Sequence, residues 1–318
     1  MVHQAVSEVS ERIDNRDIRG SVRIAREIAT AMETQAKDTD ADDPEAFRES
    51  MQEAAWQLRE TRTGAVSLSN TLRFILRNMK GDTVEEFRES TIAAVEEFQQ
   101  NLETARETLG RIGARRLRDG DTVMTHCHST DALSIVKHAL ADGKDISAFV
   151  KETRPRNQGH ITAQQLREWG VPVTIIVDNA AFRYLDDVDH VLAGAHSIAA
   201  DGSVVNSVGT STLAVAAQER NVPVTVAAQT LKLHSDALTG TGIDLEMRDG
   251  SEVLDDAVRS QIGDVDILNP VSDVTPPDHI DAIVTERGQF SPESIVTLIH
   301  DLYGESTVDA WEFGDDLD

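Results

Sequence analysis

The sequence predicts an α/β protein in which an N-terminal helical domain precedes a doubly wound, mainly parallel sheet domain. Apolar residues recur at helical spacing through residues 1–118. From Gly120 onward, short β-rich apolar runs alternate with helical segments, which is typical of a parallel sheet covered on both faces. Because 318 residues suffice for two domains, we divide the chain into 1–118 and 119–318.

Four helices are expected in the first domain. Residues 18–32 repeat apolar side chains on one face, and a second helix opens at Asp43-Pro44, since proline suits a first helical turn. A third helix begins near Ser67, and a long acidic helix occupies 83–117. The second helix is expected to bury Phe47, Met51, Ala54, Ala55 and Leu58.

Six strands and two intervening helices are expected in the second domain. The strands are 121–127, 146–152, 173–178, 190–196, 224–229 and 279–286, and the helices are 129–143 and 207–221. Ligands of parallel sheets bind beyond the carboxyl ends of the strands. Cys127, Glu152, Asp178 and His196 all stand at such ends, which predicts a functional site there.

Composition and charge narrow the class of protein. Asp and Glu number 56 against 30 Lys and Arg, and the formal net charge of -26 is spread along the chain. This distribution favours a salt-rich cytoplasm over an acidic surface for a basic partner, and direct nucleic-acid binding is not expected. No segment resembles a signal or a membrane span, and a single cysteine forms no internal disulfide, which fits a reducing cytoplasm. Neither G-x-G-x-x-G after the first strand nor a P-loop occurs, which disfavours nucleotide enzymes of those types.

Cys127, the only cysteine, has two interpretations. It could be a small buried residue, as free cysteines commonly are. Alternatively it is an acid or base, because Ser129-Thr130 can cap the next helix and a helix N-terminus lowers a thiol pKa. His126 and His128 flank it at i±1 and would point to the strand face opposite to its own, and no C-x-x-C or H-x-x-x-H spacing occurs, so no metal site is expected.

Three arginines in polar loops are phosphate-binding candidates. Arg19 lies in I-R-G before a helix, and Arg62 and Arg154 each end an E-T-R tripeptide. Arginine beside a helix start binds phosphate through bidentate hydrogen bonds and the positive helix end, although each could instead form a surface ion pair.

Three further positions belong to the same candidate site. Gly194 could let a ligand approach the strand end closely, and Asn206 precedes a helix whose first turn could bind phosphate. Lys232 is one of few lysines, although a stem packed on the surface would also explain it.

Several motifs together resemble one family. They are HCHST, ETRPRNQG, GAHSIAADG, NSVGTS and NPVSDVTPPDHIDAIVTERG, with IRG and ETRTGAVSLSNTLR in the helical half. The family contains the α, β and δ regulatory subunits of initiation factor 2B, methylthioribose-1-phosphate isomerase and archaeal ribose-1,5-bisphosphate isomerase. The likeness covers nearly the whole chain, and it is greatest to ribose-1,5-bisphosphate isomerase, because the regulatory subunits generally lack the cysteine of HCHST.

The resemblance implies a helical domain that contributes phosphate-binding loops and a Rossmann-like domain that carries a sugar-phosphate site. It also implies a homo-dimer or higher homo-oligomer without a cofactor. By position, Cys127 would be half of an acid/base pair. The residues that would bind substrate or its phosphates are Arg19, Gly20, Arg62, Arg154, Asn206 and Lys232.

Two positions depart from the isomerase pattern. His196 replaces the aspartate of G-A-D, and Ser207 replaces the lysine of N-K-[IL]-G-T. Histidine remains a competent acid or base, whereas losing the lysine costs a factor of about 10² to 10³ if nothing replaces it. Arg156 and Arg183 are candidates for that replacement.

Three functions are compatible with these residues. The first is conversion of ribose 1,5-bisphosphate into ribulose 1,5-bisphosphate by Cys-assisted proton transfer in nucleotide salvage, with Cys127, His196 and Ser207 in the site. The second is a non-catalytic regulatory subunit that binds a sugar phosphate or nucleotide and associates with initiation factor 2 subunits. The third is methylthioribose-1-phosphate isomerase.

Overall fold

The computed structural model describes two compact units. The described residues are 2–15, 17–18, 20–61, 65–234, 237–238, 240 and 245–303. The first unit contains the chain up to Ala105 together with Leu231–Leu233, and the second contains Arg106–Thr230 and His234–Leu302. The division thus falls inside a helix, and the domain boundary at residue 118 stays a prediction.

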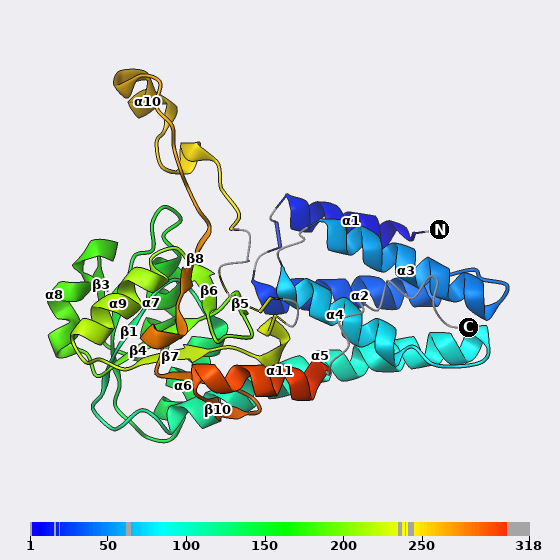
Figure 1. Ribbon diagram of the computed structural model, residues 1–318, viewed down its shortest axis with the longest axis horizontal. Helices are drawn as coiled ribbons and strands as arrows, with labels where there is room; N and C mark the ends of the chain where they lie inside the picture. Colours follow the sequence, from blue (N-terminus) through cyan, green and yellow to red (C-terminus); the bar gives the residue numbers. More distant parts are fainter. Residues whose placement is uncertain are drawn as a thin grey trace. The chain divides into compact units, whose positions relative to one another are not determined.

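Helices make up the first unit (Figure 1). They are α1 (Gln4–Asp14), α2 (Ser21–Asp38), α3 (Pro44–Glu60), α4 (Val66–Asn78) and the beginning of α5 (Val84–Ala114). The Asp43 carboxylate accepts a hydrogen bond from Ala46 N–H, and Pro44 occupies the first turn, so this predicted helix start is confirmed. The other three predicted helices are also present, with ends that differ by a few residues.

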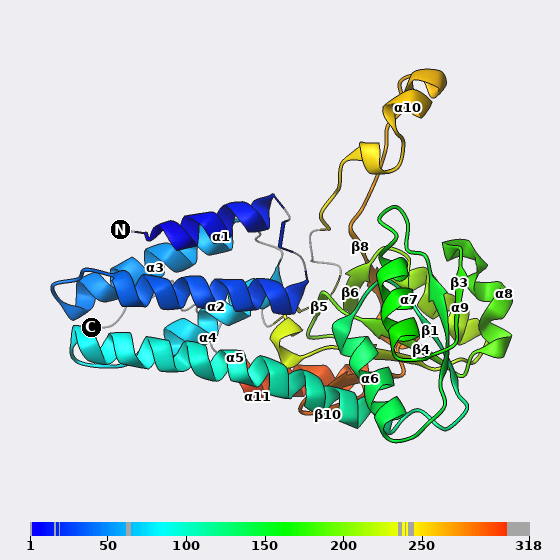
Figure 2. The same cartoon turned by 180° about the vertical axis from the view of Figure 1, so that it is seen from behind.

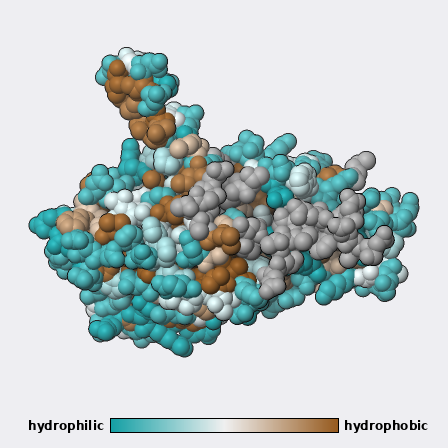
Figure 3. Space-filling model, in the orientation of Figure 1, coloured by the Kyte–Doolittle hydropathy of each residue, from teal (hydrophilic) through white to brown (hydrophobic). Residues whose placement is uncertain are grey.

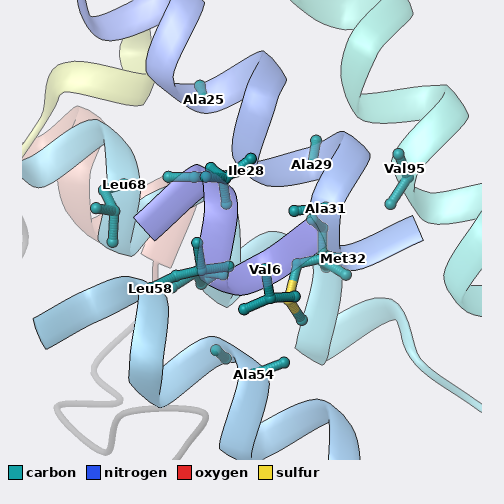
Figure 4. Close-up of a cluster of buried hydrophobic side chains, with 14 of the residues drawn as sticks. Val6, Ala25, Ile28, Ala29, Ala31, Met32, Ala54, Leu58, Leu68 and Val95 are labelled. Atoms are coloured by element: carbon teal, nitrogen blue, oxygen red, sulfur yellow. The ribbon is translucent and has the colours of Figure 1, made fainter. Parts of the chain in front are cut away.

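Apolar burial holds these helices together. Figure 4 shows side chains from several of these helices meeting in one cluster. Among them are Val6, Ile28, Met32 and Leu58, which are all fully buried. Burying each such large aliphatic side chain contributes about 1.5–3 kcal/mol. The five residues expected in the core of α3 are all fully buried, which confirms the helical periodicity of that segment.

A seven-stranded sheet forms the centre of the second unit. Its strands are β1 (Thr122–Thr125), β2 (Ser147–Lys151), β3 (Val173–Ile176), β4 (His190–Gly194), β7 (Val224–Ala227), β9 (Ala282–Thr285) and β10 (Gly288–Phe290). Their order is β10-β9-β7-β4-β1-β2-β3, and every neighbouring pair is parallel except β9 and β10. All six predicted strands are present, and the predicted fold class is confirmed.

Helices cover both faces of this sheet (Figure 2). One apolar cluster joins Val123 to α6 (Thr130–Ala141) and α7 (Gln158–Glu168). The adjacent Met124 belongs to another cluster, with α8 (Ala181–Tyr184) and α9 (Thr210–Glu219). Because successive strand residues point to opposite faces, the two clusters lie on opposite sides, as in a doubly wound fold.

A second, three-stranded sheet was not expected from the sequence. It consists of β5 (Ser197–Ile198), β6 (Val204–Ser207) and β8 (Ser272–Thr275), in the order β5-β6-β8 with antiparallel pairs. The helix expected from residue 207 therefore begins later, at Thr210, because Ser207 ends β6. With two residues, β5 is too short to give a periodic signal, and the pairing of β6 with β8 joins segments far apart in the chain.

The remaining elements are two helices and several short turns. They are α10 (Asp256–Ile262), α11 (Ile295–Tyr303) and short 3-10 turns at Asp178–Ala180, Leu185–Asp187, Thr230–Lys232, Gly250–Glu252, Pro277–His279 and Pro292–Ser294. In Figure 3, hydrophobic surface gathers on the projecting segment around α10, where Val253, Val258 and Ile262 are exposed. Within the described ranges, no helix combines the length and apolarity needed to span a bilayer.

Gly159→Ala should destabilise the protein, because a Cβ at Gly159 would lie 1.8 Å from the Lys151 carbonyl oxygen, where β2 meets α7. Such overpacking against backbone is expected to lower the free energy of unfolding by about 1–3 kcal/mol. Denaturant unfolding measures this, with the exposed Gln164→Ala on the same helix as a control. Equal stability of the two variants would contradict the close packing at Gly159.

Candidate functional site

The site lies where the connections of the main sheet diverge. From β1 the chain adds β2 and β3 on one side, then crosses to β4 on the other side. Such a switch point opens a crevice at the carboxyl ends of the strands. Cys127 follows β1, and Glu152, Asp178 and His196 follow β2, β3 and β4, so their predicted placement at strand ends is confirmed.

Polar partners surround the Cys127 side chain, although it is only 6 % exposed. Its Sγ donates to Gln158 Oε1 at 2.9 Å and accepts from Ser207 Oγ at 2.9 Å. Its backbone N–H donates to Thr153 Oγ1 at 2.8 Å. A cysteine that served only to fill the core would be packed in hydrocarbon, so these contacts favour the chemical interpretation of Cys127.

The expected lowering of the Cys127 pKa is wrong. Ser129 does cap α6, because its Oγ accepts from Ala132 N–H at 3.2 Å. However, burial raises the pKa of the Cys127 thiol, and this outweighs the hydrogen bond from Ser207 and the charge of Arg248, which both lower it. At neutral pH the group is therefore a thiol unless a partner takes its proton.

Lys151, at the end of β2, is buried, and the sequence reasoning missed both this lysine and its charged neighbour Asp273. Lys151 Nζ donates to the Gly209 carbonyl at 3.1 Å, and burial lowers the Lys151 pKa. Asp178 and Asp273 act on Lys151 in the opposite direction. Asp273 also accepts from Gly209 N–H at 2.7 Å. A lysine inside an apolar strand is a signal that could have been used, because burying an ammonium group requires charged or polar partners.

The two histidines that flank Cys127 have separate partners. His126 Nε2 lies 2.9 Å from the Val208 carbonyl oxygen, and His128 Nδ1 lies 3.0 Å from Thr162 Oγ1. Burial lowers the pKa of His126 to about 4. Among the residues that the structure describes, no group of three or more His, Cys, Asp and Glu is placed to bind a metal ion.

His196 is positioned by the second sheet. Its backbone N–H donates to the Val205 carbonyl at 2.8 Å, and its Nδ1 lies 2.9 Å from Ser272 Oγ. Asn206 is buried, and its Nδ2 donates to Thr210 Oγ1 at 3.0 Å, across the start of α9. The structure thus brings Cys127 and Ser207 into contact and places His196 on the adjoining strand pair.

Gly194 serves the protein's own packing. A Cβ there would lie 2.2 Å from Ser129 Oγ, so the glycine makes room for the side chain that caps α6. This contact explains the glycine without a ligand, and the expectation that Gly194 and Ala195 let a ligand approach stays a prediction. The sequence could not distinguish the two causes, because both require the absence of a side chain.

The predicted phosphate-binding residues are distributed over both units. In the second unit, Arg154 is exposed, and its Nη1 is 3.4 Å from Asn157 Oδ1. In the first unit, Gly20 precedes α2 with φ of 87°, where a Cβ would meet nothing within 4 Å. Lys232 belongs to the first unit and is buried. The other two predicted phosphate ligands, Arg19 and Arg62, lie outside the described residues.

Two contacts of these loops were not foreseen. Asn70 Nδ2 donates to the carbonyls of Leu231 and Leu233, each at 2.9 Å, and thereby holds the segment that carries Lys232 against α4. Arg156 forms an ion pair with Glu252. Arg156 is thus already paired, which argues against it as the replacement for the missing lysine at Ser207.

The fold and this site define a family. The chain belongs to the initiation factor 2 subunit family, whose model matches residues 17–292. Ribose 1,5-bisphosphate isomerase of Haloferax volcanii is 57% identical over 310 residues, covering 98% of this chain and 96% of that protein. The enzyme of the same name from Haloterrigena turkmenica is 57% identical over 319 residues, covering 98% of each.

More distant relatives carry other names. Methylthioribose-1-phosphate isomerase of Thermosipho melanesiensis is 35% identical over 304 residues, covering 90% of this chain and 86% of that protein. The crystal structure of translation initiation factor eIF-2B from Pyrococcus horikoshii matches with a TM-score of 0.79 at 28% identity, covering 92% of this chain and 99% of that one. The resemblance to the isomerase and initiation factor family is therefore confirmed.

Acid should destabilise the protein through His126. Its folded pKa of about 4 lies below the ordinary value of 6.5, so the unfolded state binds a proton first as the pH falls. The free energy of unfolding should therefore fall between pH 6.5 and 4, by about 3 kcal/mol from this residue, with no such loss above that range.

Denaturant unfolding across this pH range measures the effect. His126→Gln should flatten the acid-side slope, whereas His300→Gln, at an exposed position on α11, should leave the slope as it is. An unchanged slope in His126→Gln would contradict the lowered pKa of His126 in the folded protein.

Proposed function

We propose that this protein is an aldose–ketose isomerase that converts ribose 1,5-bisphosphate into ribulose 1,5-bisphosphate. The observation that carries the proposal is the single cysteine, buried at the switch point of a parallel sheet and hydrogen-bonded by Ser207 and Gln158. The two isomerases that are 57% identical along nearly the whole chain support it.

The chemistry needs two groups that exchange protons. The product has a carbonyl at C2 and one more hydrogen on C1 than the substrate. A base must therefore take the C2 proton and return it to C1, and an acid must protonate the departing ring oxygen and then accept the O2 proton. Cys127 takes the first role and His196 the second. Both return to their starting protonation states, so no cofactor is required.

The remaining predicted residues bind the substrate in this proposal. Ser207 contacts Cys127 and Asn206 precedes Ser207 on β6, and both contact the sugar in this proposal. The residues that bind the two phosphates are Arg19, Gly20, Arg62, Arg154 and Lys232. The helical domain up to residue 118 thus contributes phosphate-binding loops to the sugar-phosphate site of residues 119–318.

The cellular setting follows from composition and family. A net charge of -26 spread over the chain suits a salt-rich cytoplasm of a halophilic archaeon. The reaction belongs to nucleotide salvage, where it consumes a phosphorylated pentose derived from AMP metabolism. The protein acts as a homo-dimer or higher homo-oligomer.

Direct turnover tests the function. Purified protein in high salt is incubated with ribose 1,5-bisphosphate, and ribulose 1,5-bisphosphate is followed by NMR. Formation of the ketose supports the isomerase, and absence of turnover under conditions where the protein is folded would refute it.

Cys127→Ser should separate chemistry from binding. The hydroxyl is a far weaker base than a thiolate, so turnover should fall by about 10³-fold. The phosphate-binding loops are untouched, so substrate should still raise the melting temperature of the variant as it does for the wild type. A variant that unfolds without a change in specific activity would instead identify Cys127 as a core residue.

A non-catalytic regulatory subunit is the second candidate. His196 and Ser207 favour it, because they replace the aspartate and lysine of the isomerase motifs. Co-purification with initiation factor 2 subunits would support this function. Turnover in the absence of any such partner in a pull-down would exclude it.

Methylthioribose-1-phosphate isomerase is the third candidate. Arg19, Arg62 and Arg154 provide more phosphate-binding capacity than a substrate with one phosphate requires. Competition between the two substrates should therefore favour the bisphosphate, and a preference for the monophosphate would reverse the order of the two isomerase functions.

A further inference from the structure

The peptide group between Cys127 and His128 is held at its oxygen by a threonine of α7. Thr162 Oγ1 donates to the Cys127 carbonyl at 2.8 Å, and Thr162 is buried. A threonine hydroxyl in a helix ordinarily bonds to a carbonyl one turn earlier in the same helix, as Thr91 does with Phe87. The Thr162 hydroxyl instead ties α7 to the residue that carries the thiol.

The imidazole of His128 holds the same hydroxyl from its other side. His128 Nδ1 lies 3.0 Å from Thr162 Oγ1. A hydroxyl has one proton, and here that proton is directed to the Cys127 carbonyl, which can only accept. Nδ1 therefore carries the ring proton and donates to Thr162. Burial lowers the pKa of His128, so the ring is neutral at neutral pH.

The side chains of Cys127 and His128 lie along one face of α7. Cys127 Sγ contacts Gln158, and His128 contacts Thr162, one helical turn later. The expectation that these two neighbours point to opposite faces of a strand is therefore wrong. The reason is that β1 ends at Thr125 and that Cys127, with φ of 64°, has left the extended backbone in which side chains alternate.

The N–H of the same peptide group acts on the sulfur. A peptide group is planar and trans, so its N–H points away from its C=O. With the oxygen held by Thr162, the His128 N–H serves as a donor to Cys127 Sγ and lowers the pKa of the thiol. Such a donor stabilises the charged thiolate more than the neutral thiol. The orientation of this peptide therefore bears on the ability of Cys127 to act as a base.

We propose that Thr162 is a positioning residue, which fixes the peptide group after Cys127 so that the His128 N–H stays directed at the sulfur. This role rests on the proposed isomerase function, in which the cysteine must be a thiolate to take the C2 proton. The donors follow one another from the imidazole to the threonine hydroxyl, to the peptide oxygen, and from the peptide N–H to the sulfur. Each hydrogen bond polarises the next, which strengthens the last donor.

The other groups that act on the thiol do not involve Thr162. Burial and the charge of Asp178 raise the thiol pKa, whereas the Ser207 hydroxyl and the charge of Arg248 lower it. His126 has a pKa of about 4 and is neutral at neutral pH. The other ionisable groups at the ends of the neighbouring strands are Lys151, Glu152 and His196. Because a change at Thr162 removes none of these groups, a shifted thiol pKa reports on the peptide N–H.

Four variants separate the threonine hydroxyl from the packing of the side chain. Thr162→Val removes the hydroxyl and keeps the shape, and Thr162→Ser keeps the hydroxyl. His128→Leu removes the ring donor and leaves the backbone N–H in place. Thr91→Val is the matched control, because Thr91 is also buried in a helix and its hydroxyl donates within that helix.

Ionisation of the thiol and turnover are then measured together. Cysteine labelled with carbon-13 at Cβ gives one NMR signal in this chain, and its chemical shift follows ionisation at equilibrium. In Thr162→Val, ionisation should begin at a pH about one unit higher, equivalent to tenfold less thiolate at a given pH. The kcat for ribose 1,5-bisphosphate at neutral pH should fall about tenfold with little change in KM, and raising the pH should restore it.

The remaining variants identify the hydroxyl as the cause. Thr162→Ser and Thr91→Val should match the wild type in both measurements. His128→Leu should shift ionisation in the same direction as Thr162→Val but by less, because the threonine hydroxyl still holds the peptide oxygen.

The NMR titration separates this role from the isomerase function. Wild-type ionisation in a folded Thr162→Val would overturn the role of Thr162, whatever the turnover. An equal shift in Thr162→Ser would also overturn it, and so would a lower melting temperature without any shift, which would show a structural role alone. Shifted ionisation in a protein that never converts the bisphosphate would keep Thr162 as a positioning residue for the thiol and remove the isomerase function.

Discussion

The hydrogen bond from Cys127 N–H to Thr153 Oγ1 is the contact on which the site depends. It joins the residues that follow β1 and β2, and Thr153 N–H in turn donates to Asp178 after β3 at 2.9 Å. Cys127 and Thr153 both have positive φ, at 64° and 61°, a conformation that is costly for residues with a Cβ. Three strand ends are thereby locked together, and the thiol is aimed at Ser207 and Gln158.

Much of the fold could be predicted because its signals are local. The apolar runs of the parallel sheet and the Asp43-Pro44 helix start are visible in the sequence and recur in the structure. The second sheet could not be predicted, because β5 has two residues and because β6 pairs with Ser272–Thr275, far away in the chain.

The residue types of the site could be predicted from the sequence, but the pKa shift of the Cys127 thiol could not. Cys127 and Ser207 do meet, as the motifs suggested. The effect of burial on the thiol pKa could not be foreseen, because it depends on the side chains packed around the strand end. Ser272 carried no signal either, since a serine in a polar stretch has nothing to distinguish it before its neighbours across the sheet are known.

The segment that carries α10 is held at its base by backbone hydrogen bonds, one of which reaches the residue that follows Ser207. At its base, Arg248 N–H donates to the Asn269 carbonyl, and the Val271 carbonyl accepts from Val208 N–H, next to Ser207. Glu252 pairs with Arg156 in the loop that leads to Gln158. Because Arg248 lies at the base of this segment and lowers the pKa of the Cys127 thiol, the way the segment is anchored bears on the charge state of the sulfur.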